Sequence, residues 1–216
     1  VKLSAYKEAV AHLTKGLELL KTLPTTPESI RYELDIQVTL GMAFTATAYC
    51  SPDAIRAYAQ ARILCYQIGQ KLKLFEILGG LSNFHIHRGE FQTARELIEE
   101  RLNLAQQMDD PFLLREAYHT LGDCLFYLGE LSSAQAYLEQ SLALDQPQPH
   151  RSLTSYFWDH RPHCLSTIAH VLWLLGYPEQ ALEKSRQALI QAQEFSYPLV
   201  LAYILNDTAE TRLLCG

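Results

Sequence analysis

Apolar side chains recur every three or four residues along most of the chain, which is the spacing that predicts amphipathic helices. The pattern runs through residues 114–128 and resumes at 134–142 after a short polar break. A second pair of such stretches covers residues 165–175 and 181–189. The alternation typical of strands has no convincing example in the sequence. The chain is therefore predicted to be all-α.

Glycine and alanine mark the breaks between these helices at a fixed spacing. Three glycines are each followed five residues later by an alanine: Gly89 and Ala94, Gly129 and Ala134, Gly176 and Ala181. Glycine adopts the left-handed conformation that ends a helix without steric cost. Alanine suits a point where two helices approach closely. The spacing predicts antiparallel helix hairpins.

A small residue also stands twelve positions before each of these alanines: Ser82, Gly122 and Ala169. These combined marks resemble the tetratricopeptide repeat, which implies hairpins stacked into a right-handed α-α superhelix. Counting from Ala54, the alanines are 40, 40 and 47 residues apart, longer than the usual repeat of about 34. HEAT and armadillo arrays have such periods and are the competing interpretation, but the glycine and small-residue marks favour tetratricopeptide hairpins.

The remaining segments predict a single array over residues 1–216. A fourth, weaker hairpin pairs Leu40-Gly41 with Ala54 and Tyr58, without the turn glycine. Partial repeats are expected at residues 4–21 and 199–214. We expect about four hairpins with these partial end repeats, and a long irregular loop near residues 146–162. Both ends look like cuts through a longer polypeptide.

Four segments together resemble one bacterial family: residues 16–24, 33–37, 88–97 and 173–182. It is the C-terminal repeat region of cyanobacterial-type signalling proteins that join an adenylate/guanylate cyclase or kinase domain to an AAA-like ATPase. The family's usual Asp-Pro-Gly-Val before Cys-Leu is replaced here by Asp159-His160-Arg161-Pro162-His163. The family's catalytic activities belong to other segments and are not implied for these residues.

Composition narrows the possible partners. The net charge is −6 and no basic stripe occurs, so we expect no nucleic acid partner. No apolar run approaches the roughly 20 residues of a membrane span, so no membrane partner is expected. Five cysteines lack any C-x-x-C pairing. They are interpreted as buried reduced thiols of a cytoplasmic protein.

Phosphate-loop, dinucleotide, nucleophile-elbow and H-E-x-x-H motifs are all absent from the sequence. The repeat register instead places a set of polar and aromatic residues on first-helix positions that face the concave groove. This candidate binding set consists of Asn83, His87, His119, Asp123, Phe126, Tyr127, His163, His170 and Trp173. The groove lacks the Lys/Arg set with which some tetratricopeptide proteins clamp a terminal carboxylate, so that mode of binding is not expected.

A metal site needs three or four converging ligands. The candidate histidines are spread over separate hairpins, so we expect them not to converge, and we expect neither metal nor cofactor. The chain is accordingly predicted not to be an enzyme. Convergence of three ligands among His87, His119, Asp123 and His163 would favour the catalytic alternative.

Stacked hairpins typically serve as binding surfaces. We therefore predict a non-catalytic interaction or sensor module of a signal-transduction protein, binding a protein, peptide or small ligand. Another domain of the parent chain is a further candidate partner. The alternative is a self-association module that forms a homo-oligomer. The aromatic run at residues 156–158 either packs against the hairpins or forms a contact surface.

Overall fold

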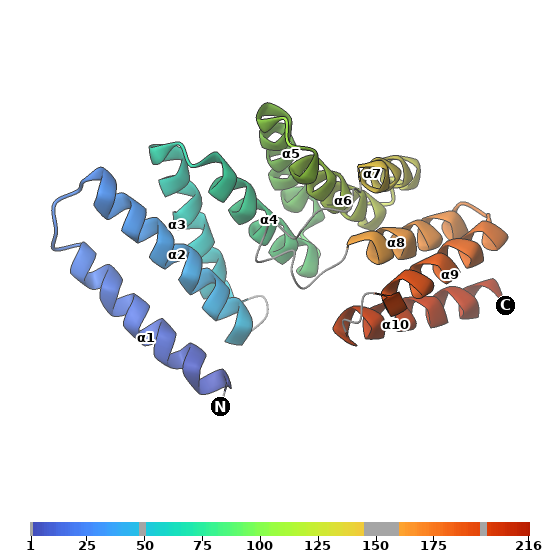
Figure 1. Cartoon of the computed structure of the whole chain (residues 1–216), viewed down its shortest axis with the longest axis horizontal. Helices are drawn as coiled ribbons and strands as arrows, with labels where there is room; N and C mark the ends of the chain where they lie inside the picture. The colour runs from blue at the N-terminus through green and yellow to red at the C-terminus, as the bar shows by residue number, and fades with distance from the viewer. Residues whose placement is uncertain (1, 48–50, 145–159, 195–197) are drawn as a thin grey trace. The chain divides into compact units, whose positions relative to one another are not determined.

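The computed structural model describes residues 2–47, 51–144, 160–194 and 198–216. All regular structure in these ranges is helical, so the prediction of an all-α fold is confirmed (Figure 1). Its helices are α1 (Lys2–Leu20), α2 (Pro27–Thr47), α3 (Pro52–Ile68), α4 (Lys71–His87), α5 (Phe91–Met108), α6 (Pro111–Tyr127), α7 (Leu131–Ala143), α8 (His160–Leu174), α9 (Pro178–Glu194) and α10 (Pro198–Cys215). None of the described helices combines the length and apolar character that a membrane-spanning helix needs.

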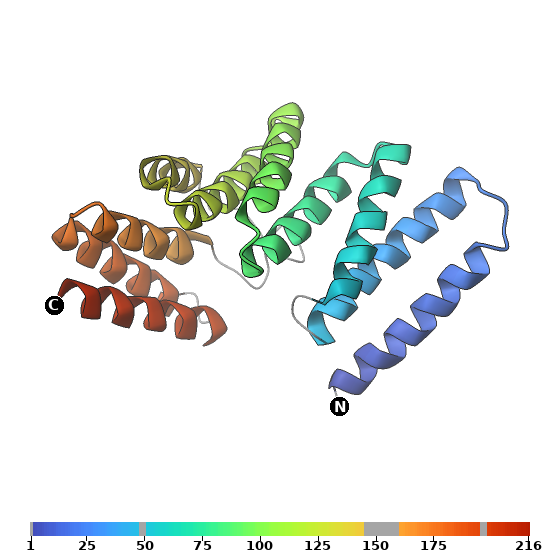
Figure 2. The same cartoon turned by 180° about the vertical axis from the view of Figure 1, so that it is seen from behind.

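The chain divides into two compact units, Val1–Leu104 and Ala105–Gly216. In unit 1, α1 packs on α2, α2 on α3, and α3 on α4, and Figures 1 and 2 show these helices side by side. The predicted fourth hairpin corresponds to α2 and α3. A Cβ on Gly41 would lie 2.7 Å from the ring of Tyr58, so the absent side chain lets these two helices approach.

In unit 2, α6 packs on α7 and α8 on α9, and α10 contacts both α8 and α9. The small-residue marks lie where they were predicted, between the helices of a hairpin. A Cβ on Gly122 would lie 2.6 Å from Leu138 Cγ and 3.2 Å from the carbonyl oxygen of Ala134. In the next hairpin Ala169 and Ala181 are fully buried. These small residues set the close spacing of both hairpins.

The three turn glycines have the left-handed backbone that the sequence predicted, with φ of 73° at Gly89, 78° at Gly129 and 87° at Gly176. After each of them, the next residue donates its backbone N–H to a carbonyl five residues earlier. The bond from Glu130 to Leu125, for example, measures 2.9 Å. This bond satisfies a carbonyl that the end of the helix would leave without a partner.

One predicted boundary is wrong. The irregular loop was expected to extend to residue 162, but α8 begins at His160. Pro162 is tolerated there because the first turn of a helix leaves its N–H groups without intrahelical partners. The aromatic run 156–158 lies outside the described residues. Of the cysteines, Cys65, Cys124 and Cys164 are buried free thiols as expected.

Candidate functional site: a pocket between three helices of unit 2

The best-defined candidate site lies between α6, α8 and α10. Helix α6 begins sharply because the Asp110 carboxylate accepts a hydrogen bond of 2.9 Å from the N–H of Phe112, and Pro111 occupies the first helical position. With the start of the helix fixed, residues four positions apart share one face. His119, Asp123 and Tyr127 therefore follow one another along the side of α6 that carries the site.

The three helices form the walls of a pocket within unit 2 that is open to solvent and has a volume of ≈ 360 Å³. Its walls combine aromatic rings with carboxylates and imidazoles. The lining residues are Asp123, Phe126 and Tyr127 from α6, His163, Thr167, His170, Trp173 and Leu174 from α8, and Tyr203, Asp207, Glu210 and Leu214 from α10.

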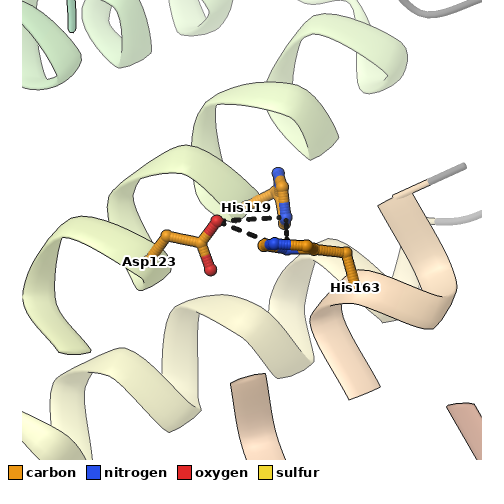
Figure 3. Close-up of side chains that lie close together, drawn as sticks. All are labelled: His119, Asp123 and His163. Atoms are coloured by element: carbon orange, nitrogen blue, oxygen red, sulfur yellow. Dashed lines mark hydrogen bonds and ion pairs between the residues drawn. The ribbon is translucent and has the colours of Figure 1, made fainter. Parts of the chain in front are cut away.

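At one end of the pocket the polar side chains of His119, Asp123 and His163 converge. We call these three residues the triad. Figure 3 shows the three side chains pointing toward one another from α6 and α8. His119 Nε2 lies 2.9 Å from His163 Nδ1. Asp123 Oδ2 lies 3.3 Å from His119 Nε2 and 3.5 Å from His163 Nδ1. The triad is largely shielded, since its side chains are only 11 to 19 % exposed.

Neighbouring groups hold the triad in place. The hydroxyl of Thr167 donates to the other oxygen of the Asp123 carboxylate at 3.1 Å, which fixes the carboxylate plane. The His163 ring stacks on Tyr203 of α10, with ring centroids 5.3 Å apart and planes inclined by 26°. All three helices thus contribute to the orientation of the triad.

Aromatic side chains form the other end of the pocket. The rings of Phe126 and His170 stack with centroids 6.3 Å apart, and Trp173 donates from Nε1 to the carbonyl oxygen of Leu214 at 3.1 Å. The Nε2 atom of His170 is buried and has no hydrogen-bond partner among the described residues. A buried polar atom in this state costs free energy that a ligand can recover.

The pocket favours positive charge. Asp123, Asp207 and Glu210 contribute carboxylates, and the described lining contains no lysine or arginine. Burial raises the pKa of Tyr127, and the charges of Asp123 and Asp207 raise it further. The pKa of Tyr203 is raised by burial and the same two carboxylates. Both phenols therefore stay neutral at physiological pH and can act as hydrogen-bond donors beside the carboxylates.

Most of the predicted groove residues meet in this pocket. Six of the nine predicted residues line it: Asp123, Phe126, Tyr127, His163, His170 and Trp173. A seventh, His119, does not line the pocket but contacts His163, which does. Asn83 and His87 do not line it, because they are exposed residues of α4 in unit 1.

Sequence reasoning missed the wall that α10 contributes. Tyr203, Asp207, Glu210 and Leu214 are spaced four, three and four residues apart, which places them on one face of a helix. That mixed aromatic and acidic face was the available signal. It was overlooked because α10 was interpreted only as a partial end repeat.

The expectation that the candidate ligands do not converge was wrong for three of them. His119 and His163 are 44 residues apart but their nitrogens are 2.9 Å apart. The reason is that α6 and α8, the first helices of neighbouring hairpins, contact each other directly. Ligands on separate hairpins can therefore meet where first helices are neighbours.

Comparison with known proteins supports the repeat interpretation. Residues 73–146 match the family model of the tetratricopeptide repeat. Response regulator aspartate phosphatase A of Bacillus subtilis (strain 168) is 27 % identical over 99 residues, covering 46 % of this chain and 24 % of that protein. A tetratricopeptide repeat region is thus confirmed over residues 73–146, whereas the resemblance to cyclase or kinase signalling proteins stays a prediction.

Solved structures share the fold. The Signal Transduction ATPase with Numerous Domains from Pyrococcus horikoshii, which has a tetratricopeptide repeat sensor, aligns with a TM-score of 0.76 at 16 % identity. That alignment covers 100 % of this chain and 32 % of the other. NprR in complex with its cognate peptide NprX aligns with a TM-score of 0.65 at 18 % identity, over 94 % of this chain and 55 % of NprR. The fold is therefore a tetratricopeptide-like helical solenoid, which generally serves as a non-catalytic interaction module.

Proposed function

We propose that the unit 2 pocket is the ligand-binding site of a non-catalytic interaction and sensor module, and that its ligand is a peptide or a peptide segment of a protein. The observation that carries the proposal is the pocket itself, whose walls combine aromatic rings with the carboxylates of Asp123, Asp207 and Glu210 across three helices. Aromatic side chains in such a position provide large contact areas at low entropic cost. The peptide complex of NprR, a chain of the same fold, supports this class of ligand.

The chemistry of the pocket specifies the peptide further. A lysine or arginine side chain, or a free amino terminus, matches the carboxylates of Asp207 and Glu210. An adjacent aromatic or aliphatic side chain matches the stacked rings of Phe126 and His170. A terminal carboxylate is disfavoured, because the described lining holds no lysine or arginine to pair with it. The proposed ligand is therefore a peptide with a cationic group next to an apolar one.

The setting we propose is a cytoplasmic, multidomain signal-transduction protein. The likeness to the Pyrococcus horikoshii ATPase, which carries a tetratricopeptide repeat sensor, supports such a parent. The ligand is then either a separate protein or peptide or a segment of another domain of the parent chain. Binding transmits a signal only if the ligand prefers one arrangement of the helices over another.

A peptide-display selection on the immobilised 216-residue chain tests this proposal. Enriched peptides are expected to carry lysine or arginine beside aromatic or aliphatic residues. Their affinities are then measured for the wild type and two matched variants. Tyr127→Ala removes an aromatic side chain that lines the pocket, and Tyr32→Ala removes one that is 62 % exposed on α2 of unit 1.

Tyr127→Ala is expected to weaken binding at least about tenfold, as loss of an aromatic anchor typically does. Tyr32→Ala is expected to leave the affinity within about twofold of the wild type, a change below 0.5 kcal/mol or so. Equal losses in the two variants, or selection of acidic peptides, would contradict the proposal.

Two alternatives have an observation in their favour. Self-association is favoured by α10, where Leu213 is 84 % and Leu205 47 % exposed. Light scattering across a range of concentrations tests it, and a mass that stays at the monomer value argues against it. The catalytic alternative is favoured by the converging triad, but the open pocket beside it is better suited to binding than to excluding water.

A further inference from the structure

The spacing of the triad atoms matches the coordination sphere of one metal ion. His119 Nε2, Asp123 Oδ2 and His163 Nδ1 form a triangle with sides of 2.9, 3.3 and 3.5 Å. In a tetrahedral zinc site with bonds of about 2.05 Å, neighbouring ligand atoms are roughly 3.3 Å apart. An ion about 2.05 Å from all three atoms would lie roughly 0.8 Å out of their plane, as in a tetrahedron.

Hydrogen bonds alone do not account well for the close approach of these three atoms. If one neutral imidazole nitrogen donates a hydrogen bond to the other across 2.9 Å, the accepting nitrogen carries no proton. Its lone pair then lies close to the negative oxygen of Asp123 without a hydrogen bond between them. If both nitrogens carry protons instead, two N–H groups face each other at that distance. A cation between the three atoms accepts all three lone pairs at once. The geometry therefore favours a bound cation over a hydrogen-bonded ring.

The groups around the triad act as outer-sphere supports do in metal sites. Thr167 donates to Asp123 Oδ1 at 3.1 Å, which leaves Oδ2 directed at the two imidazoles. Tyr203 stacks on the His163 ring and limits its rotation. Such partners orient the ligands and strengthen metal binding. The site is thus supported by residues from α8 and α10 in addition to its ligands.

We propose that His119, Asp123 and His163 bind one divalent transition-metal ion, with Zn²⁺ as the preferred occupant. Two imidazole nitrogens and one carboxylate oxygen suit zinc and its neighbours, whereas Ca²⁺ and Mg²⁺ require more oxygen ligands. Three protein ligands leave a fourth position open. Because Asp123 and His163 also line the pocket, this position adjoins the space in which a ligand binds. An electron-pair donor of that ligand, or water, completes the coordination.

The inference goes beyond the proposed peptide binding, and the two can fail separately. The peptide experiment compares the peptide affinities of the wild type and Tyr127→Ala, whereas the metal experiment compares the Zn²⁺ affinities of the wild type and the triad variants. The 216-residue chain is dialysed against a chelator, and Zn²⁺ binding is measured by titration calorimetry. The same titration with Co²⁺ is followed by visible absorption, which reports tetrahedral coordination directly.

The wild-type chain is expected to bind one Zn²⁺ per chain and to gain a higher Tm with it. His119→Ala, Asp123→Asn and His163→Ala are each expected to weaken binding at least about tenfold and to lose the tetrahedral Co²⁺ spectrum. The matched control is His12→Ala, which removes an exposed imidazole on α1 of unit 1 that belongs to neither the triad nor the pocket. It is expected to keep the wild-type affinity.

Circular dichroism checks that each variant is folded, and Asp123→Asn preserves the size of the side chain. The proposal is overturned if the folded wild type binds Zn²⁺ no more tightly than the triad variants do. It is equally overturned if His12→Ala loses binding to the same extent, because the ion would then be held by histidines in general.

Discussion

Helices α4 and α6 occupy the same place in successive repeats, yet their corresponding faces carry different chemistry. Gly79 and His119 both lie ten residues before a turn glycine, and Asn83 and Asp123 both lie six before it. In unit 1 the missing side chain of Gly79 leaves space for the guanidinium of Arg101. A Cβ at that position would be 3.0 Å from Arg101 Cζ.

Arg101 in turn covers the ring of Phe75, with 4.1 Å between Cζ and the ring centroid. In unit 2 the equivalent position carries His119, one of the two imidazoles of the triad. The repeat thus fixes the backbone through its glycine and alanine marks, while first-helix positions between the marks carry different residues in the two repeats. One repeat uses such a position for packing and the next uses it for ligand chemistry.

The largest effect is expected when α6 receives, at positions 119 and 123, the residues that α4 carries at positions 79 and 83. The double variant His119→Gly/Asp123→Asn is expected to lose Zn²⁺ binding by at least about 100-fold, or roughly 2.7 kcal/mol, because one imidazole and the ionised carboxylate are gone. Titration calorimetry measures the change. A double variant that binds Zn²⁺ like the wild type would show that the difference between the two repeats is not functional.

Gly122→Ala tests whether the marks set the hairpin spacing. The added Cβ meets Leu138 at 2.6 Å and the backbone of Ala134 at 3.2 Å, so the helices must separate. The free energy of unfolding is expected to fall by about 1–3 kcal/mol, as overpacking typically costs. Urea unfolding followed by circular dichroism measures it, and an unchanged midpoint would refute the role assigned to Gly122.

A buried polar contact between helices of unit 2 is expected to stabilise the fold more than an exposed one in unit 1. In unit 2 the Ser166 hydroxyl donates to the Asp207 carboxylate at 2.7 Å in a buried setting. Ser166→Ala should cost about 1–2 kcal/mol, because it leaves a buried acceptor without its donor. In unit 1 the exposed pair Lys73–Asp35 should contribute at most about 1 kcal/mol, measured by Lys73→Ala. The reverse order of the two losses in urea unfolding would contradict the burial argument.

The smallest effect is expected for Gly79→Ala, the counterpart of Gly122→Ala. Its Cβ meets only the flexible end of Arg101. Alanine favours a helix over glycine by about 1 kcal/mol, and displacement of Arg101 from Phe75 costs about the same. The free energy of unfolding should therefore stay nearly constant. A loss as large as that of Gly122→Ala would mean that Gly79 also marks a tight helix contact.

The sequence was sufficient to predict the all-α fold and the turns at Gly89, Gly129 and Gly176, because these glycines act through local backbone geometry. The repeat register also identified six of the twelve residues that line the pocket, since it fixes which side of a first helix faces the groove. It did not predict the meeting of His119 with His163. That distance depends on how closely α6 and α8 pack, which no local pattern encodes.

The contribution of α10 was missed for a similar reason. Helix α10 packs on both α8 and α9, so its rotation is set by tertiary contacts and not by a repeat mark of its own. Tyr203 and Asp207 gain their roles only because that rotation turns them toward His163 and Ser166. Positions that depend on packing between hairpins need a structure.

Hydrogen exchange of the whole chain, with and without a peptide selected by display, tests the central claim that ligand recognition lies in unit 2. Binding in the pocket between α6, α8 and α10 is expected to slow amide exchange in residues 119–127, 163–174 and 203–214. Exchange in α2, residues 27–47, should stay unchanged. Protection confined to helices of unit 1, with none in the three pocket segments, would contradict the account.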